Sequence, residues 1–284
     1  MRGGDRPLHI EKIGKTSILE FAQTTYKLAK QTMPKYSSKF SKKTFTLQQH
    51  AAVICLRIRE NKGYREIVEL LAEMPRVRRA LDLDEIPHPS TLCKAFNRIQ
   101  TKLWRNLLKT TAKLLKLNGI VSIDSSGEER SRASHHYTKR IKLHIQELKV
   151  TLLVDTAENA VLDAHITTTR KHDTQIAPKL LKRCFELICI LLGDKGFDDQ
   201  DIRELAHDLG IRPLIKHREF TNLHKAWNAR MDTKLYNQRN QSESVNSSMG
   251  RKYGSYITSR VWYRQFREVI LKCSVYNIDR SIKN

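Results

Sequence analysis

Apolar residues recur at a helical period in the first part of the chain. Between residues 47 and 60, Ala51, Ile54 and Ile58 fall on one face, which predicts an amphipathic helix. Thr44 is its expected N-cap, and the Asn-Lys-Gly run at 61–63 ends it. Further helices are expected over 64–74, over 90–99 with Ser90 and Thr91 at the start, and over 104–117. Residues 1–43 are basic and weakly patterned, and 37–43 is expected to be a loop.

From about residue 119 the pattern changes to strands that alternate with helices. Strands are expected over 120–124, 148–155, 160–168, 189–194 and 211–216, with a hairpin turn at Glu158-Asn159. Helices are expected over 173–184, 198–209 (ended by Gly210), 235–252 and 260–276. The order β-β-β-α-β-α-β-α-α predicts an α/β fold, a mixed five-stranded sheet flanked by helices. We therefore expect a basic segment at 1–43, a helical domain at 44–117 and an α/β domain at 118–284.

The charge of the chain indicates a polyanionic partner. A total of 52 Lys and Arg against 30 Asp and Glu gives a net charge of +22, with nucleic acid as the first candidate partner. Roughly two thirds of this excess lies in the first 120 residues, which indicates a basic module ahead of a more balanced one. Membrane attachment is not expected, because no apolar run approaches about 20 residues and no signal peptide is evident.

The five cysteines form no C-x-x-C pair, so a zinc site is not expected. Their apolar surroundings predict buried structural thiols in a reducing cytoplasm. A stripe formed by Trp262, Tyr263, Phe266 and Ile270 is likewise expected to belong to the core rather than to a platform for stacking bases.

The helices over 47–60, 64–74 and 90–99 form a helix-turn-helix-like arrangement. The third carries Lys94, Asn97 and Arg98, which could contact DNA. An α-helical packing domain without DNA contact is the alternative. His136, Lys139 and Arg140 follow the first strand and are further candidates for a DNA path, or for an ordinary surface loop.

Three acidic residues stand in settings that favour metal chemistry. Asp124 and Asp194 each close an apolar strand-like run, where a carboxylate is costly unless a positive charge compensates it. Glu243 lies on a predicted helix, with Tyr236 and Arg239 on the same face. Mg²⁺ prefers oxygen ligands, and two such ions can support phosphoryl transfer on DNA. The alternatives are turn caps for the two Asp and a solvent-facing Arg239–Glu243 salt bridge. Asp155 is expected to close a strand turn, and Asp173 to cap a helix.

These residues resemble the signature of bacterial and archaeal insertion-sequence transposases of the DDE class. The resemblance spans about residues 45–280 and is most specific over 120–260. Its motifs are Tyr236-x-x-Arg239-x-x-x-Glu243, Asp194-Lys195-Gly196-Phe197-Asp198, Ser122-Ile123-Asp124-Ser125-Ser126-Gly127 and the stretch 153–173.

The resemblance implies a ribonuclease-H-like catalytic domain in a DNA transposase. Asp124, Asp194 and Glu243 would hold two Mg²⁺ ions, with Mn²⁺ able to substitute, and Tyr236 and Arg239 would handle DNA. The implied activity is cleavage at the element ends and strand transfer into target DNA. The implied partners are double-stranded DNA, as terminal inverted repeats and target, and further copies of the chain. The implied setting is the nucleoid of a prokaryotic cytoplasm.

The chain departs from this signature at one position. The family has a Lys seven residues after its Glu, and this chain has Gly250, followed by Arg251 and Lys252 as candidate replacements that contact DNA. Two alternatives therefore stay open. One is a catalytically inactive, transposase-derived DNA-binding protein, and the other is a ribonuclease-H-like nuclease that performs no strand transfer.

Overall fold

The computed structural model of the chain describes residues 16–129, 147–169 and 171–283. Its first part is helical, as expected, with one additional long helix and one additional short one. The long helix, α1, lies in the segment 1–43, where the weak pattern predicted no helix. It buries Phe21, Ala22 and Ala29, and the lysines between them, such as Lys27, weaken the apolar pattern in the sequence. The helices are α1 (Ser17–Thr32), α2 (Leu47–Arg59), α3 (Tyr64–Ala72), α4 (Pro75–Ala80), α5 (Pro89–Arg98) and α6 (Thr101–Ala112).

Two helix starts differ from the expected ones because of capping chemistry. Thr46, rather than Thr44, caps α2: the Gln49 amide N–H donates to Thr46 Oγ1 at 3.0 Å, and the Thr46 N–H donates to Gln49 Oε1 at 2.8 Å. His88, rather than Ser90 or Thr91, caps α5, because Pro89 has no N–H to satisfy and fits the first helical position.

The sheet has five strands in the order β3-β2-β1-β4-β5. The strands are β1 (Ile120–Glu129), β2 (Glu147–Asp155), β3 (Ala160–Thr167), β4 (Ile190–Gly193) and β5 (Arg212–Ile215). β1, β2 and β3 pair antiparallel, whereas β4 and β5 run parallel to β1. This mixed sheet confirms the predicted ribonuclease-H-like fold. One detail was wrong: Asp124 lies in the middle of β1, opposite Leu152, because pairing with β2 extends the strand through Glu129.

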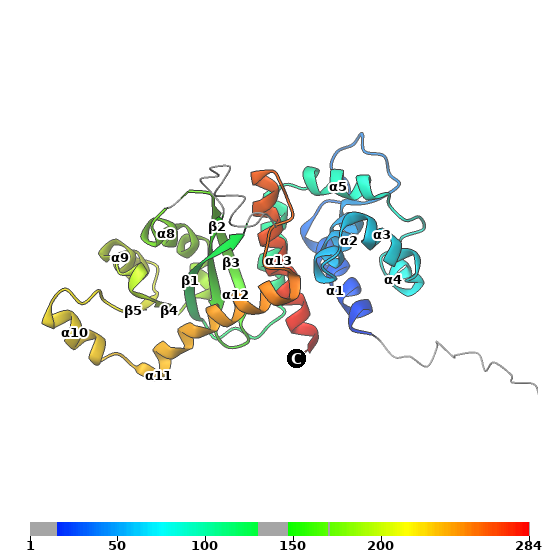
Figure 1. Cartoon of the computed structure of the whole chain (residues 1–284). Helices are drawn as coiled ribbons and strands as arrows, with labels where there is room; N and C mark the ends of the chain where they lie inside the picture. Colours follow the sequence, from blue (N-terminus) through cyan, green and yellow to red (C-terminus); the bar gives the residue numbers. More distant parts are fainter. Residues whose placement is uncertain (1–15, 130–146, 170, 284) are drawn as a thin grey trace, which may run out of the picture.

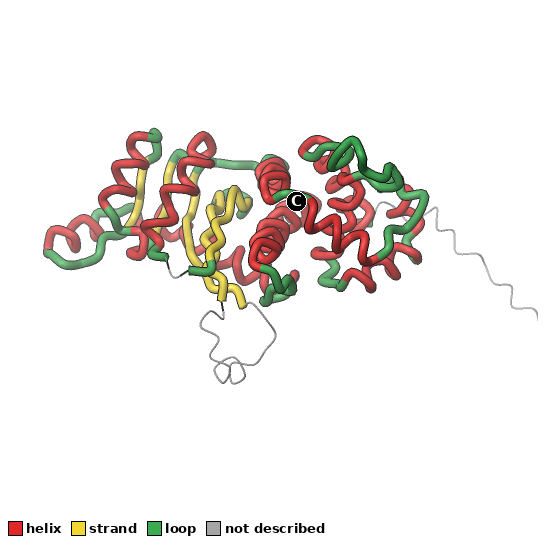
Figure 2. The backbone as a smooth tube through the Cα atoms, turned by 90° about the horizontal axis from the view of Figure 1, so that it is seen from above, coloured by secondary structure: helices red, strands yellow, loops and turns green. Residues whose placement is uncertain are grey.

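Helices cover both faces of the sheet (Figures 1 and 2). Val121 and Ile123 of β1 share a core with α8 (Asp173–Cys184) and α9 (Gln200–Asp208). On the other face, α12 (Asn240–Tyr253) lies against β1, and α6 and α13 (Trp262–Lys283) lie against β3. The apolar residues of β2, α12 and α13 share one hydrophobic cluster with those of α1, α2 and α5, so the core is continuous from the sheet to the N-terminal helices. Short elements connect these layers: η2 (Phe185–Leu187), η3 (Lys195–Phe197), α10 (Asn222–Ala229), α11 (Thr233–Tyr236) and η4 (Asn237–Arg239).

Helix α13 also satisfies the open edge of β3. The Asn277 side chain accepts from the Val161 N–H at 2.9 Å and donates to the Val161 carbonyl at 2.8 Å, so it acts in place of a neighbouring strand. Two expectations about burial were wrong. Cys189 is exposed, whereas Cys55, Cys184 and Cys273 are buried, and Trp262 is 59% exposed because it starts α13 outside the core. In the described part of the chain no helix is long and apolar enough to cross a membrane.

Candidate active site

Asp124 and Asp194 lie level with each other on neighbouring parallel strands. Ser122 of β1 pairs with Leu192 of β4, so each aspartate stands two residues beyond this pair. Neighbouring strands lie about 4.8 Å apart, which brings the two backbone positions to one edge of the sheet. The parallel pairing therefore brings the two aspartates to neighbouring positions, as the sequence pattern predicted, although only Asp194 follows the end of its strand.

The carboxylate of Asp194 is fixed by the turn that follows β4. It caps η3, with Oδ1 accepting from the Gly196 N–H at 2.8 Å. A Cβ atom on Gly196 would lie only 2.9 Å from this oxygen, so only glycine lets the carboxylate take this position. This contact gives a physical reason for the Asp-Lys-Gly order in the motif.

Glu243 reaches the same region because α12 is tied to β1. Ser122 Oγ lies 2.9 Å from the carbonyl oxygen of Arg239 and 2.9 Å from Ser242 Oγ. Alternate residues of a strand share a face, so Asp124 lies on the face of β1 that meets α12. Tyr236, Arg239 and Glu243 belong to three successive elements, α11, η4 and α12, instead of the single helix that was expected.

The pKa of Asp124 reflects its surroundings. Burial is the main cause that raises this pKa from 3.8 to about 6; the charges of Glu243 and Asp194 contribute in the same direction, and a backbone hydrogen bond from Ser125 and the charge of Arg239 oppose them. Like charges that share a site disfavour the ionised form, and a cation would relieve this. All three donors are oxygens, which suits a hard divalent ion.

The side chains are nevertheless not arranged as a closed metal cage. Among the described residues, no three His, Cys, Asp or Glu side chains lie close enough together to hold a metal ion. Glu243 Oε1 accepts from Arg239 Nη2 at 2.9 Å, which is the i,i+4 salt bridge that the sequence left open. The oxygen donors suit a divalent ion by their chemistry, but the described side chains do not enclose one.

A basic residue that the sequence analysis missed borders this site. Lys216 follows β5, and its amide lies 3.4 Å from the carbonyl of Gly193, the residue before Asp194. Its ammonium lies over the ring of Tyr236, 4.6 Å from the ring centre, while Tyr236 itself is buried. The carboxyl end of β5 beside β4 was the signal that could have identified Lys216.

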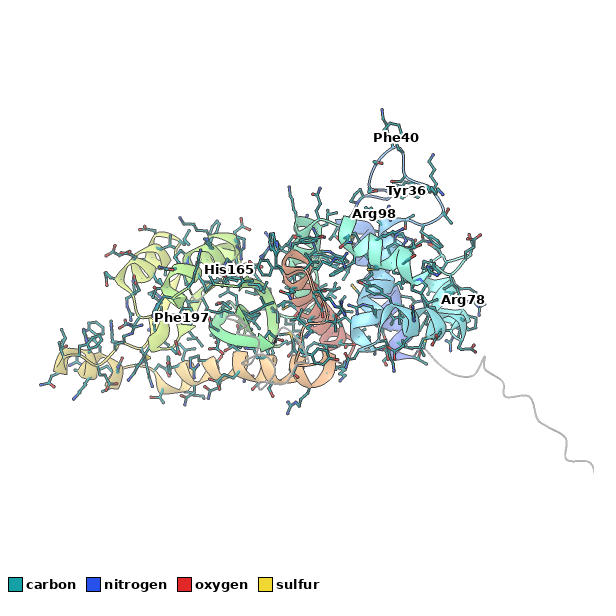
Figure 3. All side chains as sticks on the ribbon, turned by 45° about the horizontal axis from the view of Figure 1, so that its top comes forward. Tyr36, Phe40, Arg78, Arg98, His165 and Phe197 are labelled. Atoms are coloured by element: carbon teal, nitrogen blue, oxygen red, sulfur yellow. The ribbon has the colours of Figure 1, made fainter. Side chains whose placement is uncertain are left out.

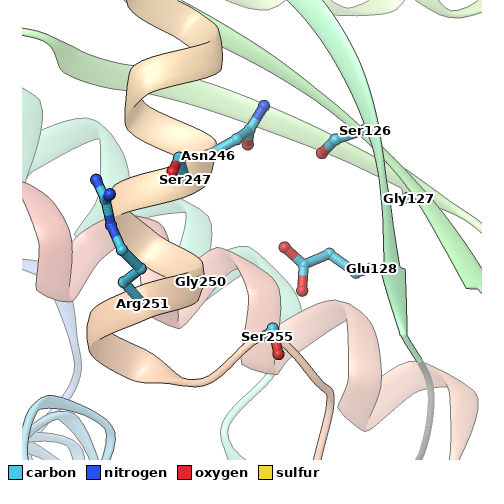
Figure 4. A pocket seen from close by; sticks show the side chains of 8 residues that line it. All are labelled: Ser126, Gly127, Glu128, Asn246, Ser247, Gly250, Arg251 and Ser255. Carbon is cyan, nitrogen blue, oxygen red and sulfur yellow. The ribbon is translucent and has the colours of Figure 1, made fainter.

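The two candidates to replace the family's Lys lie differently. Helix α12 continues through Tyr253, and the ammonium of Lys252 pairs with Asp279 of α13. Arg251 is exposed, and its side chain runs along α12 away from β1 (Figure 4). Both assignments to DNA stay predictions. His136, Lys139 and Arg140 lie outside the described residues.

The other acids of the sheet have structural partners. Asp155 accepts from the N–H groups of Asn118 and Gly119, which fixes the entry to β1. Asp173 accepts from Ser125 Oγ and pairs with Lys149 Nζ at 2.9 Å. The expectation that Asp173 caps α8 was wrong, because His172 is the N-cap.

On the N-terminal helices, Lys94 and Arg98 are exposed on α5. The loop between α1 and α2 adds an unexpected feature, since Phe40 is 85% exposed at its tip (Figure 3). Hydrogen bonds among Ser37, Ser38 and Ser41 shape this tip. The loop at 33–46 has no acid and carries four exposed lysines, so it is a basic surface: Lys35, Lys39, Lys42 and Lys43.

Comparison with known proteins decides the family. The family model described as the transposase DDE domain matches residues 115–278. The chain belongs to this family. It is a DNA transposase by descent, and the match covers the whole sheet, Asp124, Asp194, Glu243 and most of α13. A cryo-EM structure of the piggyBac transposase synaptic complex with hairpin DNA is similar at 7% identity, with a TM-score of 0.48, over 95% of this chain and 75% of that chain. No curated protein matches the chain.

Proposed function

We propose that this transposase cuts DNA at the ends of its own element and joins the ends to target DNA, with Asp124, Asp194 and Glu243 as the catalytic carboxylates. The observation that carries the proposal is the parallel pairing of β1 with β4, which sets Asp124 level with Asp194, together with the Ser122 contacts that tie the start of α12 to β1. Divalent ions are general to the family, and we assign Mg²⁺, with Mn²⁺ able to substitute, to these three residues. When bound, such ions supply positive charge to the attacking and leaving oxygens of the phosphodiester.

The residues of the chain prepare this site in three ways. Gly196 holds the Asp194 carboxylate through its N–H. Ser122 holds Glu243 close to Asp124 by fixing the start of α12. Arg239 keeps Glu243 neutralised, and when Glu243 turns to a cation the guanidinium becomes free to bind a phosphate in two-point contact.

DNA binding is assigned to both parts of the molecule. Lys216, Tyr236 and Arg239 surround the carboxylates, and Lys94 and Arg98 of α5 together with the loop at 33–46 offer a second basic surface. We propose that residues 44–117 recognise the inverted repeats and that 118–284 carry out catalysis, in an assembly of several copies that pairs two ends in the prokaryotic nucleoid.

The test uses duplexes copied from the DNA that flanks the gene, where inverted repeats are expected. Asp124→Asn, Asp194→Asn and Glu243→Gln should each lower cleavage by at least about 10³-fold, since several kcal/mol of charge stabilisation is lost. Gel-shift affinity should stay within a few-fold of the parent. Glu186→Gln, an exposed acid before the opposite end of β4, is the matched control and should cut normally. Normal cutting by any of the three variants contradicts the assignment.

A DNA-binding protein without catalysis is the second candidate, favoured by Gly250 and by the ion pair that holds Lys252. Specific gel-shift binding without cleavage in Mg²⁺ or Mn²⁺ would support it. Cleavage without joining to a second duplex would instead support a nuclease.

A further inference from the structure

The most exposed large apolar side chain in the described part of the chain lies at the tip of a loop. Phe40 is 85% exposed on the loop at 33–46, which projects beyond α5 (Figures 1 and 3). A single exposed apolar residue is ordinary on a protein surface and by itself indicates no partner. Phe40 differs from such a residue in the support beneath its ring and in the charge around it.

Hydrogen bonds tie both ends of this loop to the start of α2. The Leu47 N–H donates to the carbonyl of Lys35 at 2.9 Å, and the side-chain amide of Gln48 donates to the carbonyl of Met33 at 2.9 Å. The loop therefore leaves and rejoins the helices at two fixed points, which gives its tip a defined place relative to α2.

A closed turn presents Phe40 at the tip. The Ser41 N–H donates to the carbonyl of Ser38 at 3.2 Å, and Ser41 Oγ accepts from the Ser38 N–H at 3.2 Å. Lys39 and Phe40 are the two central residues of this turn, and the Phe40 N–H donates to Ser38 Oγ at 3.3 Å. Because the turn satisfies these backbone groups itself, its two central side chains are available to a partner.

The charge around Phe40 indicates which partner this is. The four exposed lysines of the loop have no acid within the loop to neutralise them, and the ammonium of Lys39 lies 5.1 Å from the centre of the Phe40 ring. The exposed Lys94 and Arg98 of α5 add to this charge, and Figure 3 shows Arg98 on the same side of the helices as Phe40. Stacked DNA offers both phosphates for the cations and an apolar interior for the ring.

Two other partners fit this surface less well. A second copy of the chain also carries a net charge of +22, so pairing through this loop would bring like charges together. An anionic lipid surface would attract the lysines, but a single phenylalanine buries too little apolar area for stable attachment to a membrane.

We propose that Phe40 is a wedge that enters the minor groove and inserts its ring between two stacked base pairs, so that the duplex bends around the N-terminal helices. This inference rests on the DNA binding in the proposed function. The wedge lies apart from the catalytic carboxylates, because α13 separates the loop from the sheet (Figure 1). Apolar wedges kink DNA by about 20–90°, and flexible pyrimidine–purine steps such as TA unstack at the lowest cost. The wedge therefore selects a deformable step and reads no base edge.

DNA bending without metal tests the proposal independently of cleavage. The full chain is titrated at low salt onto duplexes of about 30 base pairs that carry a fluorescent donor at one end and an acceptor at the other. One duplex has a TA step at its centre, and a matched duplex has a stiff A-tract there. Energy transfer should rise on binding to the TA duplex, because bending brings the ends together, and the parent should bind this duplex about 3- to 10-fold more tightly than the A-tract duplex.

Variants of the loop separate the wedge from general DNA binding. Phe40→Ala should remove the bend, weaken binding to the TA duplex about 5- to 10-fold and abolish the preference for it, whereas Phe40→Leu keeps an apolar wedge and should retain the bend. Lys42→Gln should reduce the slope of log affinity against log salt by about 1 and leave the bend of the bound duplex unchanged. Phe185→Ala, at an exposed phenylalanine just before β4, is the matched control and should behave as the parent.

A parent chain that binds DNA without bending it, or a bend that persists in Phe40→Ala, would overturn the proposal. Vesicles that contain phosphatidylglycerol and sedimentation of the free chain test the other partners. If Phe40→Ala loses vesicle binding or self-association while DNA bending is unchanged, the loop contacts lipid or a second copy and the wedge is wrong. If the parent fails to cut element ends, the proposed catalysis fails, and the bending measurement still decides the role of Phe40.

Discussion

Two acids in this protein, the buried Asp279 and the half-buried Asp124, have opposite electrostatic surroundings. On α13, Asp279 is enclosed by Arg59, Lys252 and Tyr253, and although burial raises its pKa, these hydrogen bonds hold the pKa below its ordinary value. On β1, Asp124 forms no ion pair with a described residue, and its pKa is raised to about 6. Acids that support packing are neutralised by the protein itself. Asp124 has no such compensating ion pair among the described residues, which supports its proposed role as a ligand of an external cation.

The largest effect on stability is expected when Asp279, the acid that forms ion pairs within the protein, is replaced. Asp279→Ala leaves Arg59 and Lys252 without their shared partner, so we expect the free energy of unfolding to fall by about 3–5 kcal/mol. Chemical denaturation measures this change. Glu186→Ala, at an exposed acid, should stay within about 0.5 kcal/mol. A loss below about 1 kcal/mol for Asp279→Ala would show that the ion pairs of Asp279 do not support packing, and the contrast with Asp124 would fail.

The comparison extends to His50, a buried side chain whose protonated, charged form is disfavoured. Burial, with a contribution from Arg98, lowers the pKa of His50 from 6.5 to about 4, and neither ring nitrogen has a described partner. The unfolded chain therefore binds this proton more readily. The contribution of neutral His50 to the free energy of unfolding is complete above pH 6.5. As the pH falls towards 4, about 3 kcal/mol of this contribution is lost. Denaturation of the parent and His50→Gln at pH 7 and pH 4.5 should show a smaller loss in the variant. Equal losses would contradict this account.

Asp124 should show the opposite behaviour. Its raised pKa means that ionisation destabilises the fold as the pH rises from 3.8 to about 6, and the full cost is present at pH 7. Asp124→Asn should therefore stabilise the metal-free protein by about 1–2 kcal/mol, after allowance for solvent screening, while it stops cleavage. Thermal unfolding with and without Mg²⁺ measures this. Mg²⁺ should raise the melting temperature of the parent more than that of the variant. If Asp124→Asn is less stable than the parent without metal, the ionised Asp124 does not destabilise the fold as we expect.

The sequence predicted the sheet well because each strand contains a short stretch rich in apolar residues, such as Ile190–Gly193, between turn signals or helical segments. It misplaced Asp124 at a strand end because Ser125, Ser126 and Gly127 have weak strand propensity, and only pairing with β2 makes them a strand. It missed α1 because the charge of residues 1–43 concealed an apolar face that packs on α2. The contact between Lys216 and Tyr236 depends on side chains that the fold brings together, which no local pattern records.

The smallest effect is expected at Gly250, where the chain departs from the family signature. Gly250→Lys restores the residue type of the family signature, and the open space beside Ser255 can accept it. An added phosphate contact should tighten DNA binding a few-fold at low salt and steepen the slope of log affinity against log salt by about 1. Gel shifts over a salt series measure this change, and Ser244→Lys, at an exposed position on α12, is the matched control for the added charge. If the salt slope is the same in the parent and in Gly250→Lys, this part of α12 does not face the DNA backbone.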